Sequence, residues 1–402
     1  MSKTVGIVGT LDTKGEEFRF LKDQIESSGL STLVINTGVL EEPFFEPDIP
    51  ADEVAKSGGD DLGEMRKIAD RGRNVAAMAK GVAVIAQQLY AEGKIHGIIS
   101  LGGSAGTTIG TSAMRALPVG VPKVMVSTMA SGDTRPYVDT KDIAMMYSVV
   151  DIAGINSLSR QILSNAAGAI AGMIKIEPPP GEDKPLIGIT MFGVTTPCVT
   201  AAREILEEAG YECLVFHATG AGGRAMEDLV RGGFLVGVLD VTTTELADEL
   251  VGGVLSAGPN RLEAAGEMGI PQVIAPGALD MVNFGPPETV PEQFKGRKFY
   301  QHNPTVTLMR TAKEENAQLG RIMAEKLNKA KGATTVLIPK RGVSAIDKEG
   351  QPFYDAEADG AFSENLKAKL NDNVTLIEMD NHINDDAFAS KLAEVLLGSL
   401  KK

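Results

Sequence analysis

One pattern of apolar strand, polar turn and helix occurs twice along this chain of 402 residues. Near the start, a short apolar run leads into the turn Gly9–Gly15 and then into an amphipathic segment. In the second half, the run from Leu186 to Thr190 leads into the turn 191–197 in the same way. Short apolar strands that alternate with helices are typical of parallel sheets with right-handed crossovers. We therefore expect an α/β fold of two Rossmann-like domains, each a mainly parallel sheet flanked by helices.

A proline-rich stretch marks the expected boundary between the two domains. Pro178, Pro179 and Pro180 are consecutive, and a run of prolines cannot continue a helix. We predict one domain at residues 1–178, a linker at 177–184 and a second domain at 184–402. A chain of this length is also too long for one ordinary core.

Two local predictions concern the first domain. Apolar residues at helical spacing predict one long helix from about Leu62 to Glu92. Residues 41–62 are rich in proline, aspartate and glutamate, and we expect them to form an excursion outside the core.

Composition narrows the classes of function. The formal net charge is −14, whereas a domain that follows a nucleic-acid backbone normally has a basic surface, so nucleic acid is disfavoured as a ligand. Only Cys198 and Cys213 are cysteines, which excludes a disulfide scaffold and a cysteine-based metal site. No apolar run is long enough to span a bilayer, and no signal-peptide region precedes the first strand. We expect a cytoplasmic protein that binds neither nucleic acid nor membrane.

The strongest candidate for anion binding is the segment Ser100–Thr108. Three glycines follow a predicted strand and lead into a predicted helix, so backbone N–H groups can approach a phosphate at the positive end of the helix dipole. The segment has neither the Gly-Lys-Ser/Thr ending of a P-loop nor the standard dinucleotide fingerprint. The alternative is a tight strand–helix turn that needs small residues.

Three other segments are expected to surround the same ligand. The turn Gly9–Gly15 would supply the positive charge of Lys14, although Asp12 in that turn is also a candidate helix cap. Asn36 and Thr37 end the second strand, where such folds contact ribose, but no acidic residue stands there, which disfavours NAD. The segment 127–134 would enclose a base or ribose. The candidate nucleotide-binding residues are Gly9, Thr10, Asp12, Thr13, Lys14, Asn36, Thr37, Gly102, Gly103, Ser104, Gly106, Thr107, Thr108, Ser127, Met129, Ser131 and Gly132.

The second domain carries the candidate catalytic residues, which are His217, Asp240, His302 and Arg310. His217 precedes the glycine-rich turn Gly220–Arg224, and histidine is the residue best suited to carry a proton near neutral pH. Arg310 follows His302 and could hold a carboxylate or phosphate. The alternative is that each histidine has a structural role. The histidines and Asp240 are too scattered for a recognisable metal motif, and we predict no metal site.

Several motifs together resemble a known family. They are Gly9–Gly15, Leu101–Thr107, His302–Thr311 and Ile338–Ser344, and they extend over nearly the whole chain. The chain resembles uncharacterised bacterial and fungal proteins similar to the ATP-binding inhibitory domain of the tomato mosaic virus resistance protein. The resemblance implies two Rossmann-like subdomains, ATP binding and a homodimer. In the plant relative this region binds a viral replication protein, a partner that is not carried over here.

Three functions remain open from the sequence. The leading hypothesis is a cytoplasmic ATP-binding protein, with Mg²⁺ accompanying the nucleotide near Asp12 or Asp133. The second is an enzyme that acts on a small carboxylate or phosphorylated metabolite at the second-domain loops and the domain cleft. The third is a regulatory protein whose binding to another protein depends on nucleotide.

Overall fold

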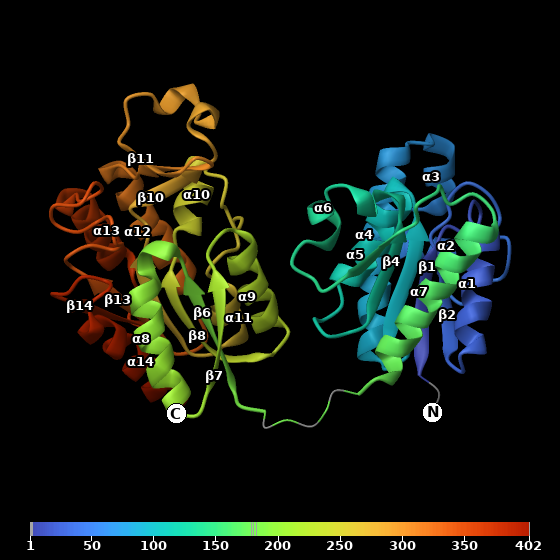
Figure 1. Ribbon diagram of the computed structural model, residues 1–402, viewed down its shortest axis with the longest axis horizontal. Helices are drawn as coiled ribbons and strands as arrows, with labels where there is room; N and C mark the ends of the chain where they lie inside the picture. Colours follow the sequence, from blue (N-terminus) through green and yellow to red (C-terminus); the bar gives the residue numbers. More distant parts are fainter. Residues whose placement is uncertain (1–2, 178, 180, 182, 402) are drawn as a thin grey trace. The chain divides into compact units, whose positions relative to one another are not determined.

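The computed structural model describes residues 3–177, 179, 181 and 183–401. The chain divides into two compact units, Met1–Pro180 and Gly181–Lys402 (Figure 1). Pro178, Pro180 and Glu182 of the expected linker lie outside the described residues. Each unit has a parallel sheet flanked by helices, so the predicted fold class is confirmed.

Unit 1 is built on a five-stranded parallel sheet with the order β2-β1-β3-β4-β5. The chain leaves β1 for β2 on one side and returns to β3 on the other, so the topology switches between β1 and β3. The elements are β1 (Thr4–Gly9), α1 (Gly15–Ser27), β2 (Ser31–Asn36), α2 (Ala51–Gly58), α3 (Leu62–Ile68), α4 (Arg71–Ala91), β3 (Gly97–Gly102), α5 (Ser104–Arg115), β4 (Lys123–Ser127), η1 (Thr128–Ser131), α6 (Arg135–Val138), β5 (Ala144–Tyr147) and α7 (Ser157–Lys175).

Both faces of this sheet are covered, which explains why its strands are continuous apolar runs. Successive residues of a strand point to opposite faces. Val34 accordingly packs with residues of α1 and α7, while Ile35 packs with residues of α2, α4 and α5. Figure 1 shows α1 and α7 on one side of the sheet and α4 and α5 on the other. Burial of the two faces leaves the strand ends as the place for a ligand.

The structure corrects both local predictions for this unit. The expected helix from Leu62 to Glu92 is interrupted, because Ala69 has a positive φ of 54° and ends α3. Asp70 then caps α4 by accepting a hydrogen bond from the backbone N–H of Arg73. The segment 41–62 also contributes to the core, since Val54 of α2 is fully buried against α4.

Unit 2 has a six-stranded parallel sheet with the order β14-β13-β9-β8-β6-β7. Its switch point lies between β6 and β8, as between β1 and β3 of unit 1. The elements are β6 (Leu186–Met191), η2 (Gly193–Thr195), α8 (Thr196–Glu208), β7 (Glu212–His217), α9 (Ala221–Arg231), β8 (Leu235–Thr242), α10 (Glu245–Val251), α11 (Ala264–Met268), β9 (Gln272–Gly277), β10 (Met281–Phe284), η3 (Pro287–Thr289), η4 (Glu292–Phe294), β11 (Phe299–Asn303), β12 (Val306–Arg310), α12 (Lys313–Leu327), β13 (Thr334–Pro339), α13 (Ala356–Lys369), β14 (Val374–Met379) and α14 (Asp386–Leu400).

A small antiparallel sheet, in the order β10-β12-β11, is an addition that the sequence pattern did not predict. It contains two of the candidate catalytic residues, His302 on β11 and Arg310 on β12. Within the described part of the chain, no helix combines the length and the apolar character that crossing a membrane requires.

Candidate functional site

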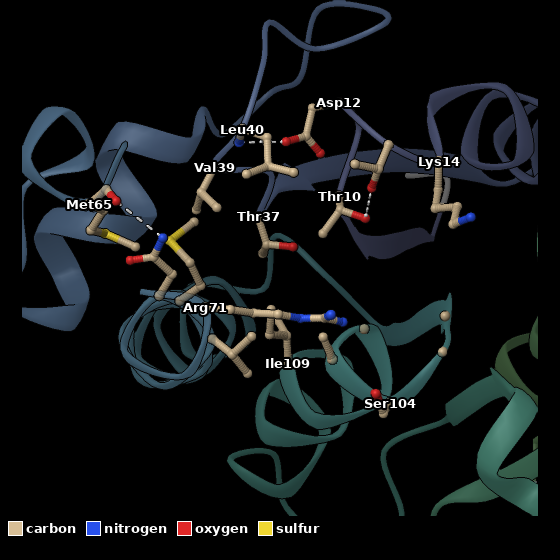
Figure 2. Close-up of a pocket in the computed structure, with 18 of the residues that line it drawn as sticks. Thr10, Asp12, Lys14, Thr37, Val39, Leu40, Met65, Arg71, Ser104 and Ile109 are labelled. Carbon is tan, nitrogen blue, oxygen red and sulfur yellow. Dashed lines mark hydrogen bonds between the residues drawn. The ribbon is translucent and has the colours of Figure 1, made fainter. Parts of the chain in front are cut away.

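A cavity of about 530 Å³ opens at the switch point of unit 1, between the carboxyl ends of β1 and β3 (Figure 2). Volumes of 300–1,000 Å³ are typical of sites for small molecules and cofactors. The walls come from the β1–α1 turn, the end of β2, the β3–α5 loop and helices α3 and α4. The lining residues are Thr10, Asp12, Thr13, Lys14, Thr37, Val39, Leu40, Met65, Arg66, Ala69, Arg71, Asn74, Val75, Met78, Gly102, Gly103, Ser104, Ala105, Gly106, Ile109 and Asp151.

The start of α5 forms one wall of this cavity. Gly103 is its N-cap and offers no side chain, and the first turn of the helix carries no acidic residue. The first N–H groups of a helix have no acceptor within the helix, and together with the helix dipole they favour an anion. Gly103 also leaves open space, because a Cβ there would lie 3.8 Å from its nearest neighbour, Thr128 Oγ1. Gly102 instead allows two stretches of backbone to lie close together, since a Cβ on Gly102 would lie 2.8 Å from Gly106 Cα.

The β1–α1 turn supplies hydroxyl groups and an ammonium group. Thr13 Oγ1 donates to Thr10 Oγ1 at 2.9 Å. Lys14 Nζ donates to the carbonyl oxygen of Ile152, which holds it at the edge of the cavity. An ammonium group has three N–H donors, so this contact leaves two for a ligand.

The end of β2 is followed by Thr37, a residue that is 2% exposed and whose Oγ1 has no hydrogen-bond partner in the described part of the chain. Figure 2 shows this hydroxyl pointing into the cavity. Asp12 lies nearby and accepts a hydrogen bond from Leu40 N through Oδ2 at 2.8 Å, while its Oδ1 has no partner among the described residues. Asn36 does not line the cavity, because its Oδ1 accepts hydrogen bonds from Leu11 N and Gly38 N.

Buried oxygens without a partner gather at this cavity. In the described part of the chain, seven buried side-chain oxygens lack a hydrogen bond. Three of them belong to residues that line the cavity: Asp12, Thr37 and Asn74. An unpaired buried polar group costs about 1–3 kcal/mol. A ligand that forms these hydrogen bonds would recover that cost.

Two arginines of the cavity were not among the predicted residues. Arg71 is exposed at the start of α4 and forms no hydrogen bond or ion pair with any described residue. Figure 2 shows its side chain extending into the space between Thr37 and Ile109. Arg66 is instead held at the rim, where it donates to the carbonyl oxygens of Val39 at 3.0 Å and Glu41 at 3.2 Å.

The remaining wall of the cavity is apolar. It consists of Val39, Met65, Val75, Met78 and Ile109. These residues come from the β2 end and from α3, α4 and α5, so a ligand that reaches from the start of α5 to this wall has a polar and an apolar end. Asn74 on α4 is a polar residue within this apolar wall, and its Nδ2 donates to the Met65 carbonyl oxygen at 3.2 Å.

Several predicted nucleotide-binding residues lie outside the cavity wall, and some of them have contacts within the fold instead. A Cβ on Gly9 would lie 2.0 Å from the ring of Phe18. Thr107 Oγ1 and Ser127 Oγ lie 2.6 Å apart, and the Thr108 hydroxyl donates to the Ser104 carbonyl oxygen. The residues outside the wall are Gly9, Asn36, Thr107, Thr108, Ser127, Met129, Ser131 and Gly132.

Asp133, which was expected near magnesium in the segment 127–134, is also held by a contact within the protein. Asp133 forms an ion pair with Arg135 at 2.8 Å. Hydrogen bonds from the Arg135 side chain and backbone lower the pKa of Asp133 to about 2. Asp151, which was not predicted, lines the cavity instead.

In unit 2, Asp240 is part of a buried ion-pair network around Arg261. Arg261 Nη1 lies 2.6 Å from Asp240 Oδ2, and Arg261 Nε lies 2.6 Å from Glu245 Oε2. Glu245 Oε1 in turn accepts hydrogen bonds from the backbone N–H groups of Gly220 at 2.7 Å and Gly223 at 3.0 Å. The start of α9 therefore already holds an anion, which is a side chain of the protein.

Arg310 is held in a second buried network. It lies 2.6 Å from Asp359 and 3.8 Å from Asp347, and its Nε donates to the Phe353 carbonyl oxygen. Burial raises the pKa of three carboxyl groups around it, to about 7 in Asp280, about 6 in Asp347 and about 8 in Asp359.

The two predicted catalytic histidines are exposed. The ring of His217 packs 5.3 Å from that of Phe192, and His302 lies on β11. Within the described residues, no hydrogen bond or ion pair joins any two of His217, Asp240, His302 and Arg310. The structure thus shows two internal networks and two exposed rings rather than one cluster of reactive groups.

Both halves of the chain match models of one protein family. Residues 3–179 match the N-terminal domain, and residues 184–400 the C-terminal domain, of the Uncharacterised protein family (UPF0261). A UPF0261 protein of Clostridium tetani is 61% identical over 404 residues, which covers 100% of both chains. These matches confirm the family resemblance inferred from the sequence motifs.

The chain is also similar to part of a longer plant protein. The ToMV resistance protein Tm-1(GCR237) of Solanum lycopersicum is 44% identical over 421 residues, which cover 98% of this chain and 56% of that protein. Among solved structures, a putative UDP-N-acetylglucosamine 2-epimerase from Listeria monocytogenes aligns with a TM-score of 0.25 and 13% identity, over 68% of this chain and 79% of that one.

Proposed function

The chain belongs to the uncharacterised protein family UPF0261, and we propose that its first unit binds ATP between the carboxyl ends of β1 and β3. The observation that carries this proposal is the start of α5, which has no side-chain cap and opens onto a cavity of about 530 Å³. Phosphate oxygens would accept hydrogen bonds from its first N–H groups and would be stabilised by the helix dipole.

The other walls of the cavity suit the remaining parts of ATP. Lys14 and Arg71 place positive charge where the phosphates would lie. Met65, Met78 and Ile109 form an apolar surface on which a base can pack, and the polarisable sulfur of methionine suits contact with a flat aromatic ring. The resemblance to the ATP-binding domain of the tomato resistance protein supports the same ligand.

Magnesium, a cytoplasmic location and a homodimer complete the proposal. Mg²⁺ bound to ATP takes carboxylate oxygens and water as ligands, and Asp151 offers a carboxylate at the cavity edge. The composition supports the location, and the family resemblance supports the dimer. Light scattering on the purified protein tests the dimer, because it should give twice the chain mass; the mass of a single chain would contradict it.

Calorimetric titration with ATP and Mg²⁺ tests the site through Gly103→Val. A Cβ at this position has room in the free protein, and the valine side chain would fill the space in front of α5. We expect affinity to fall at least 100-fold, which corresponds to about 2.7 kcal/mol. Gly168→Val is the matched control, because Gly168 is exposed on α7 and a Cβ there would meet no other described part of the chain within 4 Å. Equal affinity of Gly103→Val and wild type would remove this loop from the site.

A further inference from the structure

The cavity of unit 1 combines two kinds of chemistry that one simple anion cannot satisfy. At the start of α5, unpaired N–H groups, Lys14 and Arg71 call for a negatively charged group. In the β1–α1 turn, close to the end of β2, Asp12 presents a carboxylate oxygen without a partner among the described residues, which calls for a hydrogen-bond donor. A phosphate next to Asp12 would be repelled by its charge. The ligand must therefore carry an anionic group and, at a distance from it, a neutral donor.

Asp12 and Thr37 are held close to each other by the backbone. A Cβ on Gly38 would lie 2.4 Å from Asp12 Oδ1, so this oxygen lies against the residue that follows Thr37. Leu40 N fixes the other carboxylate oxygen at 2.8 Å. The Thr37 backbone is also fixed, since its N–H donates to the Gly9 carbonyl oxygen at 2.8 Å. Both groups are therefore positioned before a ligand arrives.

The buried Thr37 hydroxyl strengthens the case for a specific ligand group. Thr37 is 2% exposed, and its hydroxyl has no hydrogen bond with any described residue and points into the cavity. A buried hydroxyl without a hydrogen bond lowers the stability of the free protein, and a ligand that bonds to it would remove this cost. A hydroxyl can donate and accept, whereas a carboxylate only accepts. Two adjacent hydroxyl groups on a ligand would satisfy both side chains.

We infer that Asp12 and Thr37 bind the 2′,3′-diol of a ribose, so that the site selects ribonucleotides over deoxyribonucleotides. This inference rests on the proposed function and adds the identity of the sugar to it. Each side chain binds one hydroxyl group, while the phosphates extend from the sugar to the start of α5. The standard acidic residue at the end of β2 is missing from this sequence, and Asp12 takes its place from the neighbouring turn.

Competition between nucleotides tests the inference. The dissociation constants of ATP, 2′-deoxyATP and 3′-deoxyATP are measured by calorimetry on the wild type, on Thr37→Val and on Thr32→Val. Thr32 lies on the same strand, does not line the cavity and bonds to Glu26 instead, so it controls for the substitution itself. We expect each deoxynucleotide to bind wild type and Thr32→Val about tenfold more weakly than ATP.

Thr37→Val should abolish the discrimination against one of the two deoxynucleotides and keep the other. Equal affinity of the wild type for ATP and both analogues would overturn the inference while leaving ATP binding in place. Full discrimination by a folded Thr37→Val would overturn the role of Thr37. A wild type that binds none of the three would overturn the proposed function itself.

Asp12→Asn separates contact with the sugar from contact with magnesium. The amide can still accept from Leu40 N but no longer offers a second acceptor, so we expect about tenfold weaker ATP binding, with Mg²⁺ and equally with EDTA. A loss that vanishes in EDTA would assign Asp12 to the metal and overturn its contact with ribose.

Discussion

The starts of α5 in unit 1 and α9 in unit 2 follow similar glycine-rich turns but meet different surroundings. At α5, the N-cap Gly103 faces a cavity, and no side chain of the described residues caps the helix. At α9, the carboxylate of Glu245 accepts hydrogen bonds from Gly220 N and Gly223 N, and Arg261 neutralises it. One helix start is available to an anion from solution, and the other holds an anion of the protein.

The glycines of the two turns differ in the space around them. A Cβ on Gly223 would lie 2.1 Å from Glu245 Oε2, so this glycine makes room for the internal carboxylate. A Cβ on Gly103 would lie 3.8 Å from its nearest described neighbour, so Gly103 leaves room for a ligand. A glycine-rich turn before a helix therefore does not by itself identify a binding site. What fills the space in front of the helix decides between structure and binding.

Removal of Arg261 is expected to have the largest effect on stability. Arg261→Met would leave Asp240 and Glu245 buried without their counter-charge, which costs about 3–5 kcal/mol. Arg71→Met in unit 1 should change stability by less than about 0.5 kcal/mol, because Arg71 is exposed. Urea unfolding, followed by hydrogen exchange in peptides of each unit, measures both. Similar effects of the two substitutions would break the contrast between the units.

The paired glycines give the next largest difference. Gly223→Ala should destabilise unit 2 by about 2–3 kcal/mol, because the new methyl group would displace a buried ion pair. Gly103→Ala should cost less than about 1 kcal/mol, the ordinary difference between glycine and alanine at a helix N-cap. The same unfolding measurement applies. A Gly223→Ala protein as stable as the wild type would show that Glu245 is not confined by this turn.

The dependence of stability on pH should also differ between the units. Burial raises the pKa of Asp280, Asp347 and Asp359 to between about 6 and about 8, so folded unit 2 keeps protons that the unfolded chain releases above pH 4. Its stability should therefore fall as the pH rises from about 4 to about 8. The slope is about 1.4 kcal/mol per pH unit for each retained proton. His382, whose pKa burial lowers, offsets part of this fall below pH 7.

In unit 1 the carboxyl groups with shifted pKa values behave in the opposite way. Hydrogen bonds lower the pKa of Glu26, Asp60, Glu92 and Asp133, so their contribution is lost only as the pH falls below about 4. Urea unfolding at pH 5, 6.5 and 8 should show unit 1 unchanged and unit 2 weakened. Asp359→Asn should flatten the slope of unit 2, and a slope as steep as in the wild type would contradict the assignment.

The smallest expected effect concerns two buried threonines. Thr37→Val should stabilise the ligand-free protein by up to about 1 kcal/mol, because it removes a buried hydroxyl without a partner. Thr195→Val in unit 2 should cost about 1 kcal/mol, because the Thr195 hydroxyl bonds to Thr242 Oγ1 at 2.8 Å. Thermal unfolding without nucleotide measures both. Destabilisation by Thr37→Val would show that its hydroxyl has a partner within the protein.

Much of the fold was predictable from local patterns. Strands covered on both faces are continuous apolar runs, as in Thr4–Gly9, and glycine or polar turns mark their ends. The turn Gly9–Gly15 and the loop Gly102–Gly106 were expected to face each other because strand order follows from crossover topology, and both line the cavity.

The rest depends on contacts between residues far apart in the sequence. Nothing near Gly223 indicates that Glu245, 22 residues later, occupies the start of α9. The hydroxyl of Ser127 appeared available, but Thr107 lies 2.6 Å from it. Arg71 was missed because the periodicity of the segment 62–92 hid the break at Ala69, for which Asp70 as a helix cap was the available signal.

Hydrogen exchange of the full-length protein with and without saturating ATP and Mg²⁺ tests the central contrast most directly. The account predicts slower exchange of backbone amides at Thr10–Lys14 and Gly103–Gly106 when ATP is present. It predicts no change at Gly220–Gly223, where Glu245 already accepts the hydrogen bonds. Protection at Gly220–Gly223, with none around Gly103, would contradict it.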